Sequence, residues 1–467
     1  MTMFPNFIPG KIVAAAEEYK KKNPRKVTEQ EYGGPDDFRI KGVSLKPASG
    51  GKSIDMTNIF VSLQLYESIF SNTMSGEFTF LDTGNVPRKA PIIGQREEIM
   101  VEYETPGAGM ETFKMYSYSV PQKVLSTSGR KQVYSINAVP DEAYKDMHTK
   151  ISKCLSGTIT DMIEEVFKNY IKGNSKKELR VLAETSDDKY KFLIPYWTPF
   201  QTINWLCSRA IPKDKPDACN FIFYEDRESW KFTTLEELYK QDPPAMEYRF
   251  YPTGHRDVAV GGKGVADRDQ DDEFINVSRF TIDESGDRMK QIMNGMFASN
   301  LLTHDIVKKE FKYTDYNFND SFSKTEHLEK NYPLSKRSDE FSDKKDSLFL
   351  MRPKHSFMHC TKNKDDKEGK VRDNDKCEKW LLKRTSLISQ ISNKTLTVTV
   401  SGDSRIKVGD VVFMSMNSIQ QAESKYDLEK EPLYSGRYLI TELNHRIHRD
   451  GYEMTMTLSK DSEYEQI

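Results

Sequence analysis

The side chains best suited to binding a metal ion lie in one charged stretch of the sequence. His355 and His359 are four positions apart, so a helix would place both imidazoles on one face, and Cys360 and Cys377 could add two thiolates. Together they form a four-ligand zinc set, but their spacing matches no established zinc pattern. We predict that the chain binds no metal and no cofactor, with this set as the alternative.

A second candidate is a run of alternating acidic residues just before a predicted strand: Asp267, Asp269, Asp271 and Glu273. Alternating carboxylates can gather oxygen atoms around calcium. A helix-loop-helix calcium site would need glycine at position 272 and glutamate at position 278, where the sequence has Asp272 and Ser278. The run is interpreted as a solvated acidic linker.

Gly51-Lys52-Ser53 resembles the end of a phosphate-binding loop. Such a loop needs a glycine at position 46, which is Lys46, and a helix directly afterwards, so that backbone amides point at the phosphate. Residues 54–59 lead into a predicted strand instead. A glycine-serine turn is the better interpretation.

The sequence shows no set of residues typical of catalysis. It has neither the Gly-x-Ser-x-Gly turn nor a cysteine-histidine signature, and its 71 acidic residues do not single out a carboxylate pair. We predict that the protein is not an enzyme and has no catalytic residues. A cell-wall hydrolase is the least favoured alternative.

The composition of the chain excludes further classes of protein. The chain has 467 residues, which suggests several domains, and its 69 basic and 71 acidic side chains leave a net charge of -2. A basic nucleic-acid-binding face is therefore not expected, and no apolar stretch is long enough to cross a membrane. Five cysteines, odd in number, favour a reducing compartment. We expect synthesis in the cytoplasm.

The elements that would position any site begin with a region of period two. From about 43 to 140, apolar residues alternate with polar ones, and turn residues separate short runs. The clearest runs are Ile59/Val61/Leu63/Leu65, Phe78/Phe80, Ile99/Val101/Tyr103 and Tyr134/Ile136/Ala138. This pattern predicts an antiparallel β-barrel, preceded by an N-terminal arm at 1–42.

The period changes to that of helices near residue 141. One amphipathic helix is expected after Thr158, and a second after Thr198, which is a natural N-cap with Pro199 at the first helical position. A buried strand at 220–224 and a Thr234–Glu237 capping box follow. Residues 141–271 are therefore predicted to form an α/β insert.

Period two returns at 272–320 and again at 394–460, which together predict a second β-barrel. The intervening residues 321–393 are expected to form a charged loop or insert, within which 335–380 carry many charges of both signs and are expected to be mobile. Residues 461–467 are expected to form a C-terminal tail. The predicted fold is mainly β, with two tube-like antiparallel barrels bracketing the insert.

Three segments, in this order, resemble the central baseplate hub proteins of T-even-like contractile bacteriophage tails. The first runs from Asn72 through Asp82-Thr83-Gly84 and Pro91-Ile92-Ile93-Gly94 to Tyr103, the second is Pro195 to Phe200 with Trp205-Leu206, and the third is Ile406 to Asp410 followed by Gly436 to Ile440. The arm and the loop at 320–390 are longer than the family pattern.

The resemblance implies a structural homotrimer. Two barrels from each of three chains would make a pseudo-six-fold ring that joins the hexameric tail tube to the trimeric central spike and forms part of the DNA ejection channel. The implied partners are the spike, tube and tube-initiator proteins and the surrounding baseplate wedge, with the virion baseplate as location. A hub or spike component of a related injection system, such as a tailocin or a type VI-like machine, is the alternative.

Overall fold

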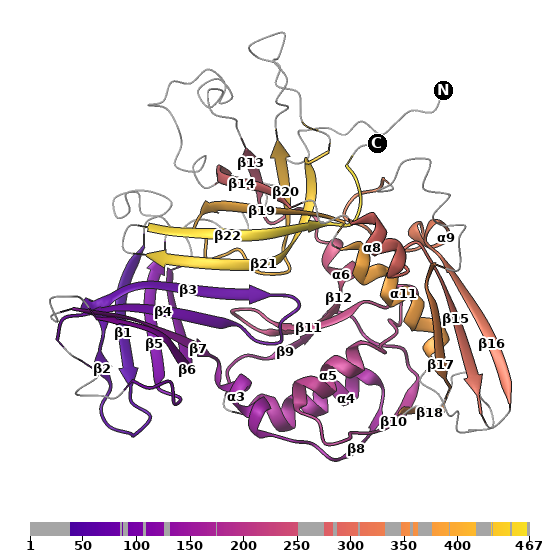
Figure 1. Ribbon diagram of the computed structural model, residues 1–467, viewed down its shortest axis with the longest axis horizontal. Coiled ribbons are helices and arrows are strands. Elements are labelled where there is room, and N and C mark those ends of the chain that lie inside the picture. The colour runs from indigo at the N-terminus through magenta and orange to yellow at the C-terminus, as the bar shows by residue number, and fades with distance from the viewer. Residues whose placement is uncertain are drawn as a thin grey trace, which may run out of the picture.

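The computed structural model describes much of the chain between residues 38 and 464 (Figure 1). The described part omits residues 85, 87–91, 106–108, 126–130, 174, 251–274, 284–286, 307–308, 332–346, 355–357, 363–375, 392, 417–430, 432 and 449–450. Of the predicted arm at 1–42, only the last residues are described, and they begin strand β1. No described helix is long and apolar enough to cross a membrane.

The first β-barrel is built from the strands predicted between about 43 and 140. They are β1 (Arg39–Lys46), β2 (Ile54–Asp55), β3 (Phe60–Ser68), β4 (Ser75–Asp82), β5 (Glu98–Thr105), β6 (Gly109–Leu125) and β7 (Gln132–Val139). Strand β2 pairs with β1, and the chain continues through the short 3-10 helix η1 (Thr57–Ile59) into β3, which pairs with β4. Because β1 also pairs with β5, the strands close in the order β1-β2/β3-β4-β7-β6-β5.

The second β-barrel draws on strands that lie far apart in the sequence. They are β13 (Glu247–Phe250), β14 (Val277–Asp283), β19 (Lys394–Ser401), β20 (Val411–Met416), β21 (Gly436–His448) and β22 (Gly451–Lys460). A bridge between Arg249 and Asn276 connects β13 to the start of β14, and the rings of Phe250 and Phe280 stack beside it. The strands therefore close in the order β13-β14-β19-β22-β21-β20.

The two barrels have the same strand order. With β2 and β3 counted as one strand, and the strands numbered along the chain, each ring runs first, second, third, sixth, fifth, fourth. The barrels differ in the direction of their first strand. Strand β1 is antiparallel to both neighbours, whereas β13 pairs in parallel with both. Strand β3 pairs with β21, so both barrels belong to one 13-stranded sheet and share a continuous apolar core.

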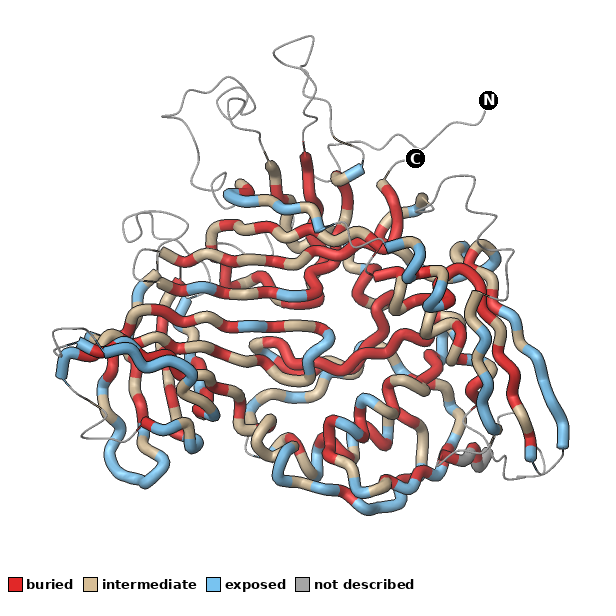
Figure 2. Tube along the Cα trace, viewed as in Figure 1, coloured by how far each residue is buried: buried red, intermediate tan, exposed pale blue. Residues whose placement is uncertain are grey.

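The insert contains the predicted helices. Thr158 and Thr198 cap α4 (Ile159–Val166) and α5 (Pro199–Cys207) through reciprocal capping boxes, and Thr234 caps α6 (Leu235–Tyr239), which confirms all three predicted N-caps. Trp230 is fully buried, and Trp197 and Trp205 pack partly buried against the same core. Figure 2 shows buried positions along the helices and strands of this part of the chain. The remaining elements are α3 (Asp141–His148), η2 (Phe167–Ile171), β8 (Cys154–Gly157), β9 (Leu179–Val181), β10 (Lys189–Leu193), β11 (Phe221–Glu225) and β12 (Trp230–Thr234).

The structure divides the predicted second barrel differently. Only β14 from the range 272–320 joins that barrel. Helix α8 (Arg288–Met293) follows, and then β15 (Ala298–Asp305), β16 (Glu310–Asn317) and β17 (Phe349–Pro353) form a separate sheet. Conversely, β13 lies inside the predicted insert range but pairs with β20. Pairing between distant strands is not visible in local periodicity, which explains both corrections.

The described parts of the predicted charged loop or insert at 321–393 contain helices and strands, so the loop interpretation is wrong for these parts. The range 318–322 forms α9 (Phe318–Phe322), β17 pairs with β15, and β18 (Met358–Lys362) pairs with β10 of the insert. Helix α11 (Cys377–Gln390) buries Trp380, Leu382 and Leu387. The dense charges of the preceding residues obscured this helix. One of its lysines, Lys383, pairs with Asp217 of the insert.

The expected C-terminal tail at 461–467 begins as packed structure. Asp461 and Ser462 are buried, and they accept hydrogen bonds from the backbone amides of Leu328 and Glu329, respectively. Residues 465–467 lie outside the described residues. In its described part, the tail thus holds the chain segment around 328 against the second barrel.

Candidate functional site: a charged junction of three units

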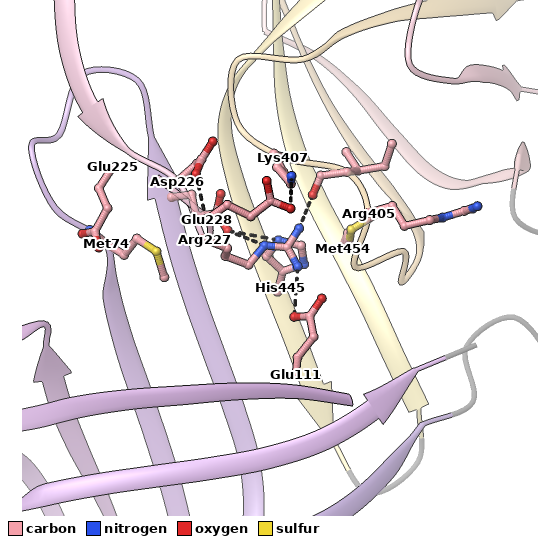
Figure 3. Close-up of polar contacts among 12 residues, drawn as sticks. Met74, Glu111, Glu225, Asp226, Arg227, Glu228, Arg405, Lys407, His445 and Met454 are labelled. Atoms are coloured by element: carbon pink, nitrogen blue, oxygen red, sulfur yellow. Dashed lines mark hydrogen bonds and ion pairs between the residues drawn. The ribbon is translucent and has the colours of Figure 1, made fainter. Parts of the chain in front are cut away.

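The hairpin between β11 and β12 extends from the insert to the place where the two barrels meet (Figure 3). Its turn is held by Asp226, whose Oδ1 accepts hydrogen bonds from the backbone amides of Glu228, at 2.8 Å, and Ser229, at 2.6 Å. An aspartate that bonds to amides two and three positions on is typical of tight turns. This turn aims the side chain of Arg227 out of the insert.

Arg227 contacts both barrels. Its Nε lies 3.0 Å from Oε1 of Glu67 on β3, and its Nη1 lies 3.4 Å from Oε2 of Glu111 on β6. Its Nη2 donates a hydrogen bond to the backbone carbonyl of Ile406, which precedes β20 in the second barrel. The Arg227 side chain is 5% exposed and that of Glu67 is 0% exposed. One buried guanidinium therefore connects the insert to both barrels.

A histidine of the second barrel completes the junction. Nε2 of His445, on β21, lies 3.5 Å from the same Glu67 oxygen, and its Nδ1 is 2.7 Å from the hydroxyl of Tyr452 on β22. On the other side, the hydroxyl of Tyr103 donates a hydrogen bond of 3.0 Å to Glu111. The charged groups are thus surrounded by barrel side chains.

The electrostatics favour one charge state. Burial raises the pKa of Glu67, but the Arg227 guanidinium and His445 outweigh it, and the net pKa is lowered. Burial and the adjacent Arg227 lower the pKa of His445, despite Glu67. The Glu67 carboxylate is therefore ionised and His445 neutral at pH 7, with Arg227 as the positive partner.

Ion pairs on both sides fix the hairpin. Nζ of Lys177 lies 2.6 Å from Glu225, whose other oxygen accepts a 3.1 Å hydrogen bond from the amide of Met74 in the first barrel. Nζ of Lys407, which leads into β20, lies 2.5 Å from Glu228. The insert is thus tied to each barrel separately as well as through Arg227.

The Gly409 turn is a second contact between the insert and the second barrel. Gly409 has a φ of +86°, and a Cβ at this position would lie 2.2 Å from the hydroxyl of Tyr224 on β11. Its carbonyl accepts a 2.7 Å hydrogen bond from the side chain of Gln241. Burial raises the pKa of neighbouring Asp410 to about 6, although Asp410 accepts a bond from the amide of Lys407. Glycine is required both by the backbone and by close packing.

This arrangement is suited to holding domains in place. A carboxylate with a lowered pKa, facing a guanidinium and buried from solvent, is poorly suited to exchanging protons with a substrate. Breaking such a buried pair by removing one partner leaves an uncompensated charge, which is costly. The junction therefore acts as a clamp on the relative positions of three units.

The residues predicted as possible ligands fall in different places. Cys360 and Cys377 are buried in separate apolar clusters. His355 lies outside the described residues, and of His359 only its backbone position in β18 is described. Among the described residues, no three histidine, cysteine or acidic side chains form a group that could hold a metal. The prediction of no metal stays untested.

The two other candidate motifs had different outcomes. Gly50 and Gly51 have φ values of +81° and +121°, in a turn between β1 and β2. Strand β2, not a helix, follows Gly51-Lys52-Ser53. The acidic run from Asp267 to Glu273 lies outside the described residues.

Sequence reasoning missed the junction, although a signal was present. Glu67 continues the inward-facing series of Leu63 and Leu65 on β3, and His445 lies between inward-facing Leu443 and Ile447 on β21. A charged or titratable residue on a barrel's interior face needs a partner, because an isolated buried charge is unfavourable. The partner, Arg227, could not be identified from the sequence because it belongs to another unit.

Comparison with known proteins agrees with this fold. No protein-family model matches the chain. A probable baseplate hub protein of Vibrio phage KVP40, gp334, is 24% identical over 442 residues, which cover 91% of this chain and 95% of that protein. The crystal structure of a tail protein from Neisseria meningitidis superposes with a TM-score of 0.50 at 11% identity, covering 92% and 97% of the two chains. A 43 kDa prophage tail protein from Shewanella oneidensis gives 0.49 at 12% identity, covering 90% and 98%. The chain is thus similar along most of its length to a probable phage baseplate hub protein, and its fold is similar to that of the tail protein from Neisseria meningitidis.

Proposed function

We propose that this chain is a structural baseplate hub protein of a contractile phage tail, located in the virion baseplate. The similarity to a baseplate hub protein over 91% of the chain supports this function. The clamp at Arg227 and Glu67 fits a structural role, since it fixes positions of units and offers no substrate site. We infer that the protein is not an enzyme.

The hub forms a homotrimer that adapts one symmetry to another. The observation that carries this proposal is the shared strand order of the two barrels. Three chains with two like barrels each would place barrels at near-equivalent positions around a six-membered ring, while the chains keep three-fold symmetry. Such a ring would match a hexameric tail tube on one side and a trimeric spike on the other.

The proposed partners follow from this geometry. The spike would bind the three-fold face, tube and tube-initiator proteins the six-fold face, and wedge proteins the periphery. The net charge of -2 fits a channel through which DNA must slide, because a cationic lining would retain the polyanion.

Light scattering after size-exclusion chromatography tests the proposal. The purified chain alone should have three times its 54.0 kDa mass. Mixed with the spike protein of the same phage, it should form a complex of three hub chains and three spike chains. A chain that stays monomeric both alone and with the spike would contradict the trimeric hub.

A further inference from the structure

A cavity of about 790 Å³ opens where four parts of the fold meet. Its walls come from the β3–β4 turn of the first barrel, helix α5 and strand β11 of the insert, helix α11, and strand β17 of the separate sheet (Figure 1). The walls are mostly apolar. We call this cavity the arginine groove and define it by Phe70, Arg209, Leu350, Arg352, Trp380 and Arg384. No aspartate or glutamate is among its described lining residues.

Arg384 is fixed in the groove by one of its nitrogens. Its Nη1 donates to the backbone carbonyls of Phe221, at 3.0 Å, and of Cys207 and Cys219, both at 3.4 Å. Its Nε and Nη2 form no hydrogen bond with any residue that the structure describes. The guanidinium is therefore pre-positioned, with donors left over for an incoming acceptor.

Arg352 is a second donor group. It is exposed on β17, and its side chain forms neither a hydrogen bond nor an ion pair with any residue that the structure describes. Leu350, two positions earlier on the same strand, lines the groove beside it. Two guanidinium groups of the groove thus have donors available, next to an apolar surface.

The walls of the groove are held together before any ligand arrives. The amides of Asn72, in the β3–β4 turn, and Asn204, on α5, bond to each other reciprocally at 2.8 and 2.9 Å. Asn72 also donates a 3.1 Å bond to the carbonyl of Phe223. A pre-formed site loses less entropy on binding than one that must be assembled.

We propose that the arginine groove binds an extended segment of a neighbouring tail protein in which acidic side chains lie beside apolar ones; this inference rests on the proposed hub function. Carboxylates match guanidinium donors in geometry and charge, and apolar side chains match the walls. The volume is within the range of sites that enclose a few side chains. A nucleic acid is disfavoured, because it would need a continuous cationic track and leave the apolar walls uncovered.

The test uses the full chain and a fluorescein-labelled dodecapeptide that alternates Leu and Phe with Glu and Asp, read by fluorescence anisotropy. Matched probes are the same peptide with Gln and Asn as the polar residues, and a thymidine dodecamer. Arg352→Glu should weaken binding of the acidic peptide about tenfold or more, since a charge-assisted contact is replaced by repulsion. Arg279→Glu, at an exposed site on β14 outside the groove, should leave binding unchanged. The amide peptide should bind about tenfold more weakly.

Several results would overturn the proposal. Equal binding of the acidic and amide peptides, or equal binding by Arg352→Glu and the native chain, would show that the groove does not recognise carboxylates. Tighter binding of the thymidine dodecamer, lost with Arg352→Glu, would assign the groove to nucleic acid. A changed mass of the Arg352→Glu chain in light scattering would assign it to a second copy of this chain.

The same preparations separate this inference from the hub proposal. A trimer that fails to bind the acidic peptide counts against the groove alone. A chain that binds the peptide but stays monomeric, with and without the spike, counts against the hub proposal.

Discussion

Nε of Arg227 lies 3.0 Å from Oε1 of Glu67, although the first residue belongs to the insert and the second to the first barrel. The same guanidinium reaches a backbone carbonyl that leads into the second barrel. Because the strands β3 and β21 also pair, the three units cannot turn relative to one another without breaking buried contacts. A rigid subunit of this kind is what a ring of like barrels requires.

Replacing Arg227 with alanine should destabilise the chain strongly. The change leaves the Glu67 carboxylate buried without its cation, and such losses amount to about 3–5 kcal/mol. The measurement is the free energy of unfolding in denaturant. Arg446→Ala is the matched control, because its pair with Glu453 is about half exposed, and we expect a change within about 0.5 kcal/mol. Equal losses for both variants would show that the junction is not a clamp.

The pH dependence of stability should change when Glu236 is replaced by glutamine. Burial raises the pKa of this carboxyl, on α6, to about 7, opposed by the amide of Glu326 and by His327. Because the pKa is higher in the folded state, the protonated Glu236 carboxyl contributes its full stabilisation of the fold below about pH 4.5. This stabilisation is lost as the pH rises through 7. Glu236→Gln should therefore be more stable than the native chain at pH 8 by on the order of 2–3 kcal/mol, with little difference at pH 4.5.

The partly exposed neighbour Glu237 supplies the control for this pH experiment. Thermal unfolding of the native chain, Glu236→Gln and Glu237→Gln is compared from pH 5 to 8. If Glu236→Gln follows the native pH profile over this range, the buried carboxyl does not titrate as described.

Gly409→Ala should destabilise the contact between the insert and the second barrel. The left-handed backbone alone costs about 1–2 kcal/mol for alanine, and the new Cβ would collide with the Tyr224 hydroxyl. In the double variant with Tyr224→Phe, the stability lost through the collision should be recovered, and the stability lost through the left-handed backbone should not. Unfolding in denaturant measures both. A Gly409→Ala chain as stable as the native one would contradict both the left-handed turn and its close packing against Tyr224.

The purified chain should contain no stoichiometric zinc. Cys360 and Cys377 pack in separate apolar clusters, so they have a structural reason to be buried without a metal. Elemental analysis and unfolding with and without a chelator measure this. About one zinc per chain, with a lower unfolding temperature after chelation, would restore the set of His355, His359, Cys360 and Cys377.

Local patterns predicted the elements whose structure depends on near neighbours. Alternation at Leu63 and Leu65 predicted a strand facing the core, and Thr198 before Pro199 predicted a helix start. Both depend on interactions within a few residues. The zinc set, in contrast, was defined by spacing alone, and spacing does not bring side chains together.

Long-range pairing was beyond local patterns. Strand β13 is short, and it is placed in the second barrel by parallel pairing with β20, far along the chain. Helix α11 follows a dense run of charges that dominated the composition of its surroundings. Nothing near Arg227 in the sequence distinguishes it from an ordinary turn residue, because its partners lie on the two barrels. In each case the deciding contact is made by residues that the sequence separates widely.

Electron cryo-microscopy of the purified assembly shows whether three chains close into a ring of six barrels. We expect particles with three-fold symmetry, in which the first and second barrels alternate around a pseudo-six-fold ring and Arg227 and Glu67 remain in contact within each chain. Particles without a closed ring, or a ring formed by only one of the two barrels, would contradict it.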